Sequence, residues 1–254
     1  MVGVSNNDFR DVRSYSYGDP IKSINWKASA RRLSVGDHTL LTNQYESEGR
    51  NTVWLFADCS AYMMVGNNLR NPMEVLAHLV TGASQYFLKR GYRVGLFPYG
   101  SNTAPLSPGI GRGQLMRISA AMRDLEPAEK AAELEAAIDQ IKIELVRDSS
   151  SAVVFARLDM PDSESLLRGV KRLVSLRPRI RAQSLPLVIG VGGYLFIDAD
   201  DWYERNGVLL MDMATRPLVR SLRKMGVRVL EWRPSDQPDW SEVAQEHARA
   251  EARE

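Results

Sequence analysis

Residues 52–57 read Thr-Val-Trp-Leu-Phe-Ala, a continuous apolar and aromatic run that ends at Asp58. A run of this length without polar alternation is typical of a strand covered on both faces, as in a parallel sheet. Over residues 72–90 apolar side chains recur at helical spacing, and Gly91 stands where a C-terminal cap is expected. A second strand is predicted at residues 92–97. Strand, helix and strand in this order indicate one unit of an α/β fold.

The alternation of strands and helices continues through most of the chain. A loop rich in Gly, Pro and Ser at residues 101–113 contains a predicted short strand at 104–106. Helices are predicted at residues 114–125, 128–146, 163–176 and 217–225, and strands at 152–156, 185–191 and 227–232. This order predicts a mostly parallel sheet with right-handed crossovers and helices on both faces.

Composition is that of an ordinary globular protein: 254 residues, 44% apolar and 25% charged. The formal net charge is +2, from 33 basic and 31 acidic residues. So small a net charge gives no long-range attraction to nucleic acid, and we expect no nucleic-acid partner.

The numbers and positions of cysteine and histidine exclude an internal disulfide and give no spacing typical of a zinc site. The single cysteine, Cys59, cannot form an internal disulfide, and His38, His78 and His247 lie too far apart for zinc-site spacing. One thiol fits a reducing compartment. The first eight residues lack the features of a secretory signal, and the apolar run at 185–197 is broken by glycines and shorter than the roughly 20 residues that cross a bilayer. We therefore expect a soluble, cytoplasmic protein without a membrane span in this chain.

Two aspartates stand at the ends of predicted strands. Asp58 ends the strand at 52–57, and Asp159 closely follows the strand at 152–156. Ligands of open α/β sheets bind beyond the carboxyl ends of the strands, so both carboxylates are candidates for one site. The structural alternative for Asp58 is a carboxylate that accepts backbone N–H bonds from the following turn. Cys59 beside it is expected to be a small buried residue rather than a nucleophile.

Enzyme chemistry finds little support in the motifs. Phosphatases that open with an apolar strand ending in aspartate need a second aspartate two positions later, where this chain has Ser60. The chain also lacks a Gly-x-Ser-x-Gly elbow and a phosphate-binding loop ending in Gly-Lys. A metal-assisted hydrolase that uses Asp58 and Asp159 is the alternative function, but it needs a base or nucleophile that the sequence does not offer. The sequence favours a protein that is not an enzyme.

Residues 9–31 form a distinctive segment, Phe-Arg-Asp-Val-Arg-Ser-Tyr-Ser-Tyr-Gly-Asp-Pro-Ile-Lys-Ser-Ile-Asn-Trp-Lys-Ala-Ser-Ala-Arg. Its Gly-Asp-Pro at 18–20 favours a turn, and Trp26 can bury its ring while its indole N–H stays available to a partner. Two interpretations are open: an intramolecular clamp that fastens this segment to the α/β domain, and a docking face for an acidic partner. The candidate residues are Arg13, Tyr15, Gly18, Asp19, Lys22, Trp26, Lys27 and Arg31.

This segment, followed by the strand that ends in Asp58-Cys59-Ser60, resembles the family catalogued as domain of unknown function 58. Its members carry a Gly-Asp-x-x-Arg-x-Ile-Asp-Trp-(Lys/Arg)-x-x-Ala-Arg signature ahead of a von Willebrand factor A-like domain. Here Lys22 replaces the usual arginine and Asn25 the usual aspartate, which weakens any pair between them because lysine lacks the bidentate fork. The resemblance implies an N-terminal extension at 1–51, a von Willebrand factor A-like domain at 52–234 and a polar C-terminal tail at 235–254.

The resemblance also implies a metal-ion-dependent adhesion site, made by Asp-x-Ser-x-Ser after the first strand, a threonine from a loop and a later aspartate. Asp58, Ser60 and Asp159 match this set, whereas Tyr62 and Ala132 stand where a serine and the threonine are expected. The implied site is therefore degenerate. Mg²⁺ is the ion it would take, because Mg²⁺ demands hard oxygen ligands in near-octahedral geometry.

Members of the family lie beside AAA+ ATPases of the MoxR type, for which A-domain proteins act as adaptors. The resemblance therefore implies a non-catalytic interaction protein that works with such an ATPase in the assembly or maturation of other complexes. Many members carry membrane segments upstream of the signature, so membrane association through partners or a missing upstream segment belongs to the same expectation.

Overall fold

The structure is a computed structural model whose chain forms two compact units, Met1–Arg50 and Asn51–Glu254, each described here by itself. The residues that it describes are 9–14, 24–33, 40–45, 52–65, 71–126, 128, 133–148, 150–159, 163–176, 186–196 and 201–232. The predicted tail at 235–254 lies outside the described residues.

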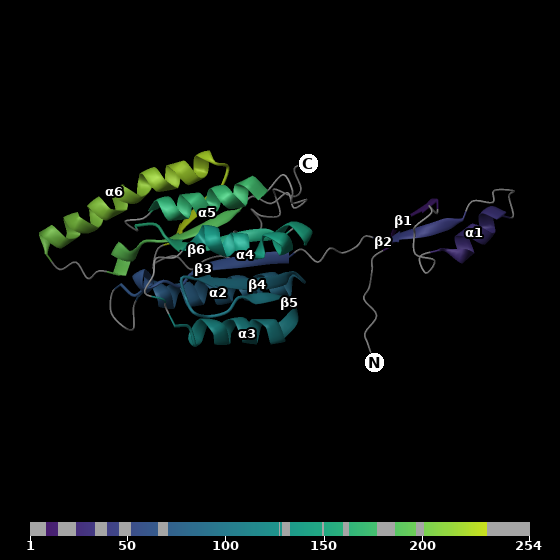
Figure 1. The fold of residues 1–254 in the computed structure, drawn as a ribbon, viewed down its shortest axis with the longest axis horizontal. Helices are drawn as coiled ribbons and strands as arrows, with labels where there is room; N and C mark the ends of the chain where they lie inside the picture. The colour runs from purple at the N-terminus through teal and green to yellow at the C-terminus, as the bar shows by residue number, and fades with distance from the viewer. Residues whose placement is uncertain are drawn as a thin grey trace. The chain divides into compact units, whose positions relative to one another are not determined.

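The larger unit is built on a six-stranded sheet of order β5-β4-β3-β6-β7-β8 (Figure 1). Its strands are β3 (Thr52–Asp58), β4 (Arg93–Tyr99), β5 (Leu106–Gly109), β6 (Ser151–Arg157), β7 (Leu187–Val191) and β8 (Arg228–Trp232). Neighbouring strands run parallel throughout, except for β4 and β5, which are antiparallel. The predicted α/β fold with a mostly parallel sheet is confirmed.

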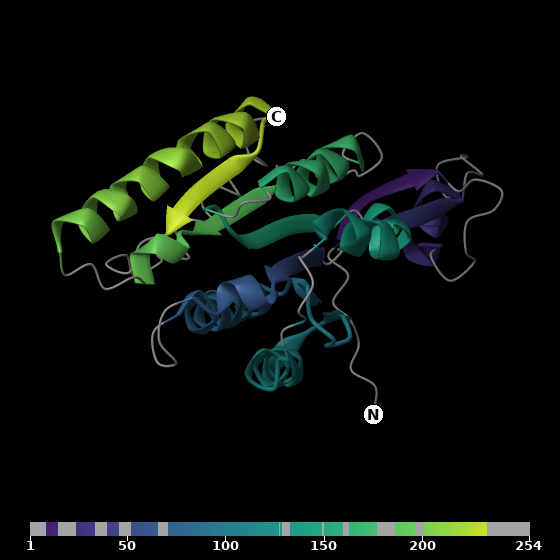
Figure 2. The ribbon, with the colours of Figure 1, turned by 60° about the vertical axis from the view of Figure 1, so that its left-hand side comes forward.

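Helices cover both faces of this sheet (Figures 1 and 2). One face carries α2 (Pro72–Lys89) and α3 (Gly111–Arg123), and the other carries α4 (Leu134–Arg147), α5 (Ser163–Leu176) and α6 (Trp202–Lys224). Because side chains alternate along a strand, Val53 and Leu55 of β3 enter the core under α2 and α3, whereas Trp54 and Phe56 enter the core under α4 to α6. Among the described helices, none offers an apolar span of bilayer length.

Local signals explain the ends of α2. The side chain of Asn71 accepts a hydrogen bond from the backbone N–H of Glu74, and Pro72 occupies the first helical position. After Lys89 the chain turns through Gly91 at φ 83°, a left-handed conformation that glycine adopts without steric cost. The helix and its glycine cap were both predicted from the spacing of residues 72–91.

Three predicted helix starts are wrong, the smallest difference being at α3, which was predicted from residue 114 and begins at Gly111. The last helix was predicted at residues 217–225, but α6 already begins at Trp202, where Asp201 and Glu204 form a capping box. Its first half buries few side chains, so apolar periodicity did not reveal it. The helix predicted from residue 128 begins only at Leu134; Ala128 instead forms a β-bridge with Ser60.

The N-terminal unit contains β1 (Phe9–Ser14), α1 (Trp26–Leu33) and β2 (Leu41–Tyr45), with β1 and β2 paired antiparallel. Asn25 caps α1 by accepting a hydrogen bond from the backbone N–H of Ala28 at 2.9 Å. The Ser29 hydroxyl accepts from the backbone N–H of Leu41 at 2.9 Å and so ties α1 to β2. Trp26 is 62% exposed, so its ring is not buried within this unit.

Candidate functional site at the carboxyl rim

The carboxyl rim is defined here as the edge of the sheet where β3, β6 and β7 end, with Asp58, Ser60, Arg157, Asp159 and Gly193. Strand β3 pairs in parallel with β6, and β6 pairs in parallel with β7, so the residues after these strands lie at one edge. The strands that precede Asp58 and Asp159 are therefore neighbours in the sheet. This edge is where ligands of α/β sheets bind.

Asp58 is buried and engaged by the turn that follows it. Its Oδ1 accepts hydrogen bonds from the backbone N–H of Ser60 at 3.1 Å and from the Ser60 hydroxyl at 2.8 Å. Burial raises the pKa of the Asp58 carboxyl, while the bonds from Ser60 and the nearby Arg157 oppose that rise. The contact with the following turn that the structural alternative requires is therefore present.

Asp159 is held by four donors. The Arg157 guanidinium binds it in a bidentate manner, with Nε 2.7 Å from Oδ1 and Nη2 3.0 Å from Oδ2. The backbone N–H groups of Gly193 and Tyr194 donate to the same two oxygens at 2.9 and 3.2 Å. The side chains of Arg157 and Asp159 are only 9% and 2% exposed, so this is a nearly buried ion pair with its acceptors satisfied.

Arg157 also reaches a third segment of the rim. Its Nη1 donates to the backbone carbonyl of Tyr62, in the 3-10 turn η2 (Ala61–Met63) that follows β3. A Cβ atom at Gly193, the first residue of η4 (Gly193–Phe196), would overlap the guanidinium. The arginine therefore contacts the segments that follow β3, β6 and β7.

Sequence reasoning missed Arg157. An arginine at the end of a strand is read as a solvated charge, and its pairing with Asp159 two residues later depends on a turn that periodicity does not reveal. The available signal was the short spacing itself, because an Arg-x-Asp sequence after a buried strand places opposite charges at the same edge of the sheet.

The rim residues do not fit Mg²⁺ as they are arranged. A magnesium ion needs free oxygen lone pairs in octahedral geometry, but both oxygens of Asp159 already accept hydrogen bonds from Arg157 and backbone amides. The Ser60 hydroxyl donates to Asp58, and the Arg157 guanidinium binds Asp159 and, through its charge, opposes the rise that burial causes in the pKa of Asp58. Ala132, the other departure from the implied ligand set, lies outside the described residues. Within the described ranges, no group of three or more His, Cys, Asp or Glu could hold a metal ion.

Neither Cys59 nor Tyr99 at this edge is poised for nucleophilic chemistry. Cys59 is fully buried, and burial raises the pKa of its thiol well above the ordinary value. Tyr99, paired with Asp58 in the register of β3 and β4, is also buried, and burial raises the pKa of its hydroxyl well above the usual range. Both groups stay protonated near neutral pH.

A chain of contacts leads from the rim to α6. The Tyr194 hydroxyl donates to Asp212 of α6 at 2.7 Å, and Arg216 donates to the other oxygen of that carboxylate at 3.3 Å. Partial burial, followed by the bond to Asp212, raises the pKa of the Tyr194 hydroxyl above its usual value. Tyr194 thus joins Asp159, through its backbone, to α6, through its side chain.

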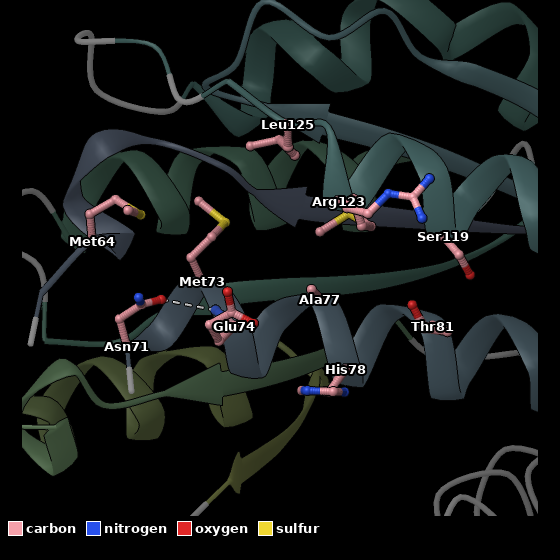
Figure 3. Close-up of a pocket in the computed structure, with 11 residues that line it drawn as sticks. Met64, Asn71, Met73, Glu74, Ala77, His78, Thr81, Ser119, Arg123 and Leu125 are labelled. Carbon is pink, nitrogen blue, oxygen red and sulfur yellow. Dashed lines mark hydrogen bonds between the residues drawn. The ribbon is translucent and has the colours of Figure 1, made fainter. Parts of the chain in front are cut away.

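A separate cavity of about 550 Å³ opens between α2 and α3 (Figure 3). Its lining combines the side chains of Met64, Met73 and Leu125 with the polar groups of His78 and Arg123. None of the rim residues lines it. No motif in the sequence predicted this cavity, because it forms between two helices that are separate in the sequence and pack together in the fold.

The candidate residues of the N-terminal signature are only partly described. Trp26, Lys27 and Arg31 lie on α1 with exposed side chains, and Arg13 lies in β1 opposite Thr42. Tyr15, Gly18, Asp19 and Lys22 lie outside the described residues. The clamp and the docking face both stay predictions.

Comparison with known families gives one family match. A family model described as "Protein of unknown function DUF58" matches residues 11–199. A search of curated proteins finds no match for this chain.

Several solved structures share the architecture. The conserved hypothetical protein BatB from Bacteroides thetaiotaomicron matches with a TM-score of 0.51 at 11% identity, over 80% of this chain and 99% of that chain. The SpRpn10 VWA domain matches with a TM-score of 0.44 at 16% identity, over 77% and 94%. A von Willebrand factor type A structure from Catenulispora acidiphila matches with a TM-score of 0.43 at 14% identity, over 82% and 43%. The fold is von Willebrand factor A-like, and at these identities the likeness concerns the fold alone.

Proposed function

We propose that this chain, which belongs to the family described as "Protein of unknown function DUF58", is a non-catalytic interaction protein with a degenerate metal-ion-dependent adhesion site. The observation that carries the proposal is the bidentate contact of Arg157 with Asp159. A hydrolase would need that carboxylate free for a metal or a substrate, whereas here it fixes the loops of the rim. The rim is then a structural connection between loops rather than a reaction centre.

The partner that we propose is a MoxR-type AAA+ ATPase, with which the chain would act in the assembly or maturation of other complexes. The resemblance of the signature segment is the support for this partner. The proposal places the chain in the cytoplasm, where such an ATPase has access to ATP, with membrane association only through partners or an upstream segment. It includes no nucleic-acid partner, in keeping with the net charge of +2.

The surface that we propose for the ATPase lies on α6, the helix beside the edge strand β8 (Figure 2). The inward residues of α6 include Thr215 and Leu218, which are buried. On the opposite side its first half exposes Leu209 and Leu210, at 59% and 67%, and other exposed apolar residues of this half are Trp202, Tyr203 and Met213. Contiguous exposed apolar side chains mark interaction sites.

Basic residues continue this outward surface toward the end of α6. Arg216, Arg220 and Lys224 are exposed at helical spacing from the apolar side chains. An apolar stripe followed by positive charge fits a partner surface that carries apolar side chains next to acidic ones. We commit to such a surface of the ATPase as the occupant.

The test is a pull-down of the co-encoded MoxR-type ATPase with the full chain, in ATP, in ADP and without nucleotide. Capture in at least one of these states is the expected result, and failure in all of them overturns the proposed partner. The double variant Leu209→Glu/Leu210→Glu should abolish capture. Ile143→Glu on α4 is the control, because Ile143 is an apolar side chain even more exposed than the α6 leucines, and it should leave capture unchanged.

A further inference from the structure

We propose that Arg157 is a built-in cation that takes the structural place of a divalent metal ion at the carboxyl rim. The wild-type rim would then bind no divalent cation, and removing the guanidinium would open a divalent-cation site formed by Asp58, Ser60 and Asp159. This inference concerns one cation on this chain and holds whether or not a partner protein binds.

The contacts of Arg157 are those by which a metal ion would organise the same edge. A metal joins ligands from separate loops and holds the loops together. The guanidinium joins the carbonyl of Tyr62 after β3 to the carboxylate of Asp159 after β6. Through that carboxylate it also holds the amides of Gly193 and Tyr194 after β7.

The geometry explains why an arginine can fill this place. A guanidinium offers five donors in a planar fork, and two of them match the two oxygens of a carboxylate. The remaining lone pairs of Asp159 accept backbone N–H groups, so the nearly buried pair leaves few groups without partners. Glycine at 193 leaves room for this placement, because a Cβ atom there would overlap the guanidinium and force it to shift.

Charge explains why a metal ion and Arg157 exclude each other. The guanidinium lies close enough to Asp58 to act on its charge and binds Asp159 directly. A divalent ion among the same carboxylates would face the positive charge of Arg157 at short range, in surroundings that screen charges less than bulk water does. Without the arginine, the carboxylates of Asp58 and Asp159, which follow neighbouring strands, would leave this edge of the sheet with net negative charge beside the Ser60 hydroxyl.

The test uses Mn²⁺ as the probe, read by electron paramagnetic resonance of free and bound ion, on the full chain. Wild type should show no binding that Asp58→Asn or Asp159→Asn abolishes. Arg157→Met keeps the apolar stem and removes the charge, and it should bind Mn²⁺ at least about tenfold more tightly than wild type. The double variant Arg157→Met/Asp159→Asn should lose that gain.

Two further variants separate charge from geometry and from surface effects. Arg157→Lys keeps the positive charge and should gain no Mn²⁺ affinity. Arg172→Met removes the partner of Asp139 on the exposed surface between α4 and α5 and should gain none either. A folded Arg157→Met that binds no Mn²⁺ overturns the inference. If Arg157→Met does not fold, the titrations of wild type and Arg157→Lys decide instead. Mn²⁺ binding by either protein that depends on Asp159 also overturns the inference.

Discussion

The Arg157 guanidinium and the Asp159 carboxylate form a bidentate, nearly buried ion pair across a two-residue turn at the end of β6, with Nε 2.7 Å from Oδ1. The pair joins segments that follow three neighbouring strands, since Asp159 also accepts the amides at the start of η4. It therefore links the order of the sheet to the shape of its carboxyl rim.

Removing the carboxylate charge should destabilise the domain strongly. Asp159→Asn leaves the guanidinium of Arg157 nearly buried without its counter-ion, and breaking one side of such a pair costs about 3–5 kcal/mol. The matched control is Asp139→Asn, which breaks the partly exposed pair with Arg172 and should cost at most about 1 kcal/mol. Urea denaturation gives both free energies of unfolding, and equal losses would contradict the assigned role.

Glycine at position 193 should be required by the arginine. In Gly193→Ala the new methyl group would overlap the Arg157 guanidinium, and such overpacking typically costs about 1–3 kcal/mol. Gly207→Ala is the control, because that glycine lies inside α6 with open space around it, and alanine should stabilise the helix by about 0.5–1 kcal/mol. A Gly193→Ala protein as stable as wild type would show that the guanidinium does not occupy this position.

The Asp58 carboxyl should titrate above its ordinary pKa of about 3.9. Burial raises its pKa and the charge of Arg157 lowers it, so in Arg157→Met the pKa of Asp58 should rise further. An acid whose folded pKa is raised binds more protons when folded, so stability falls as pH rises from about 3.9 through the folded pKa and changes no further above it. Carboxyl NMR titration measures both pKa values; an Asp58 pKa that Arg157→Met leaves unchanged would contradict the proximity of the two groups.

Asn25 should act as the N-cap of α1 rather than as a member of a charge pair. Asn25→Ala removes the acceptor of the Ala28 amide and should cost the N-terminal unit about 1 kcal/mol, seen as faster hydrogen exchange at Ala28. Asn25→Asp retains an acceptor and should keep the Ala28 amide protected. Loss of protection in both variants would assign another role to Asn25.

The sequence predicted the fold class, a mostly parallel α/β sheet, but not the order of the strands in it. Several individual elements were predicted closely. Residues 163–176 were predicted as a helix and form α5, because their apolar stripe has a clear 3.6-residue period. Buried runs such as Thr52–Asp58 were recognisable because a strand covered on both faces excludes polar side chains.

Other features could not be read from periodicity. The first half of α6 has exposed apolar side chains and few buried ones, so its sequence shows no stripe of buried residues that would predict a helix. The positions of Asp58 and Asp159 followed from the ends of their strands, but the occupant of the space beside them did not. That depended on how one turn aims Arg157, which only tertiary structure reveals.

Capture of the MoxR-type ATPase by the full chain, compared with and without EDTA in a nucleotide state that needs no added metal, tests the central claim most directly. If Arg157 serves in place of a metal ion, the rim and the α6 surface joined to it through Tyr194 need no divalent cation, and capture should be equal in both samples. Capture that EDTA abolishes and Mg²⁺ restores would contradict this account.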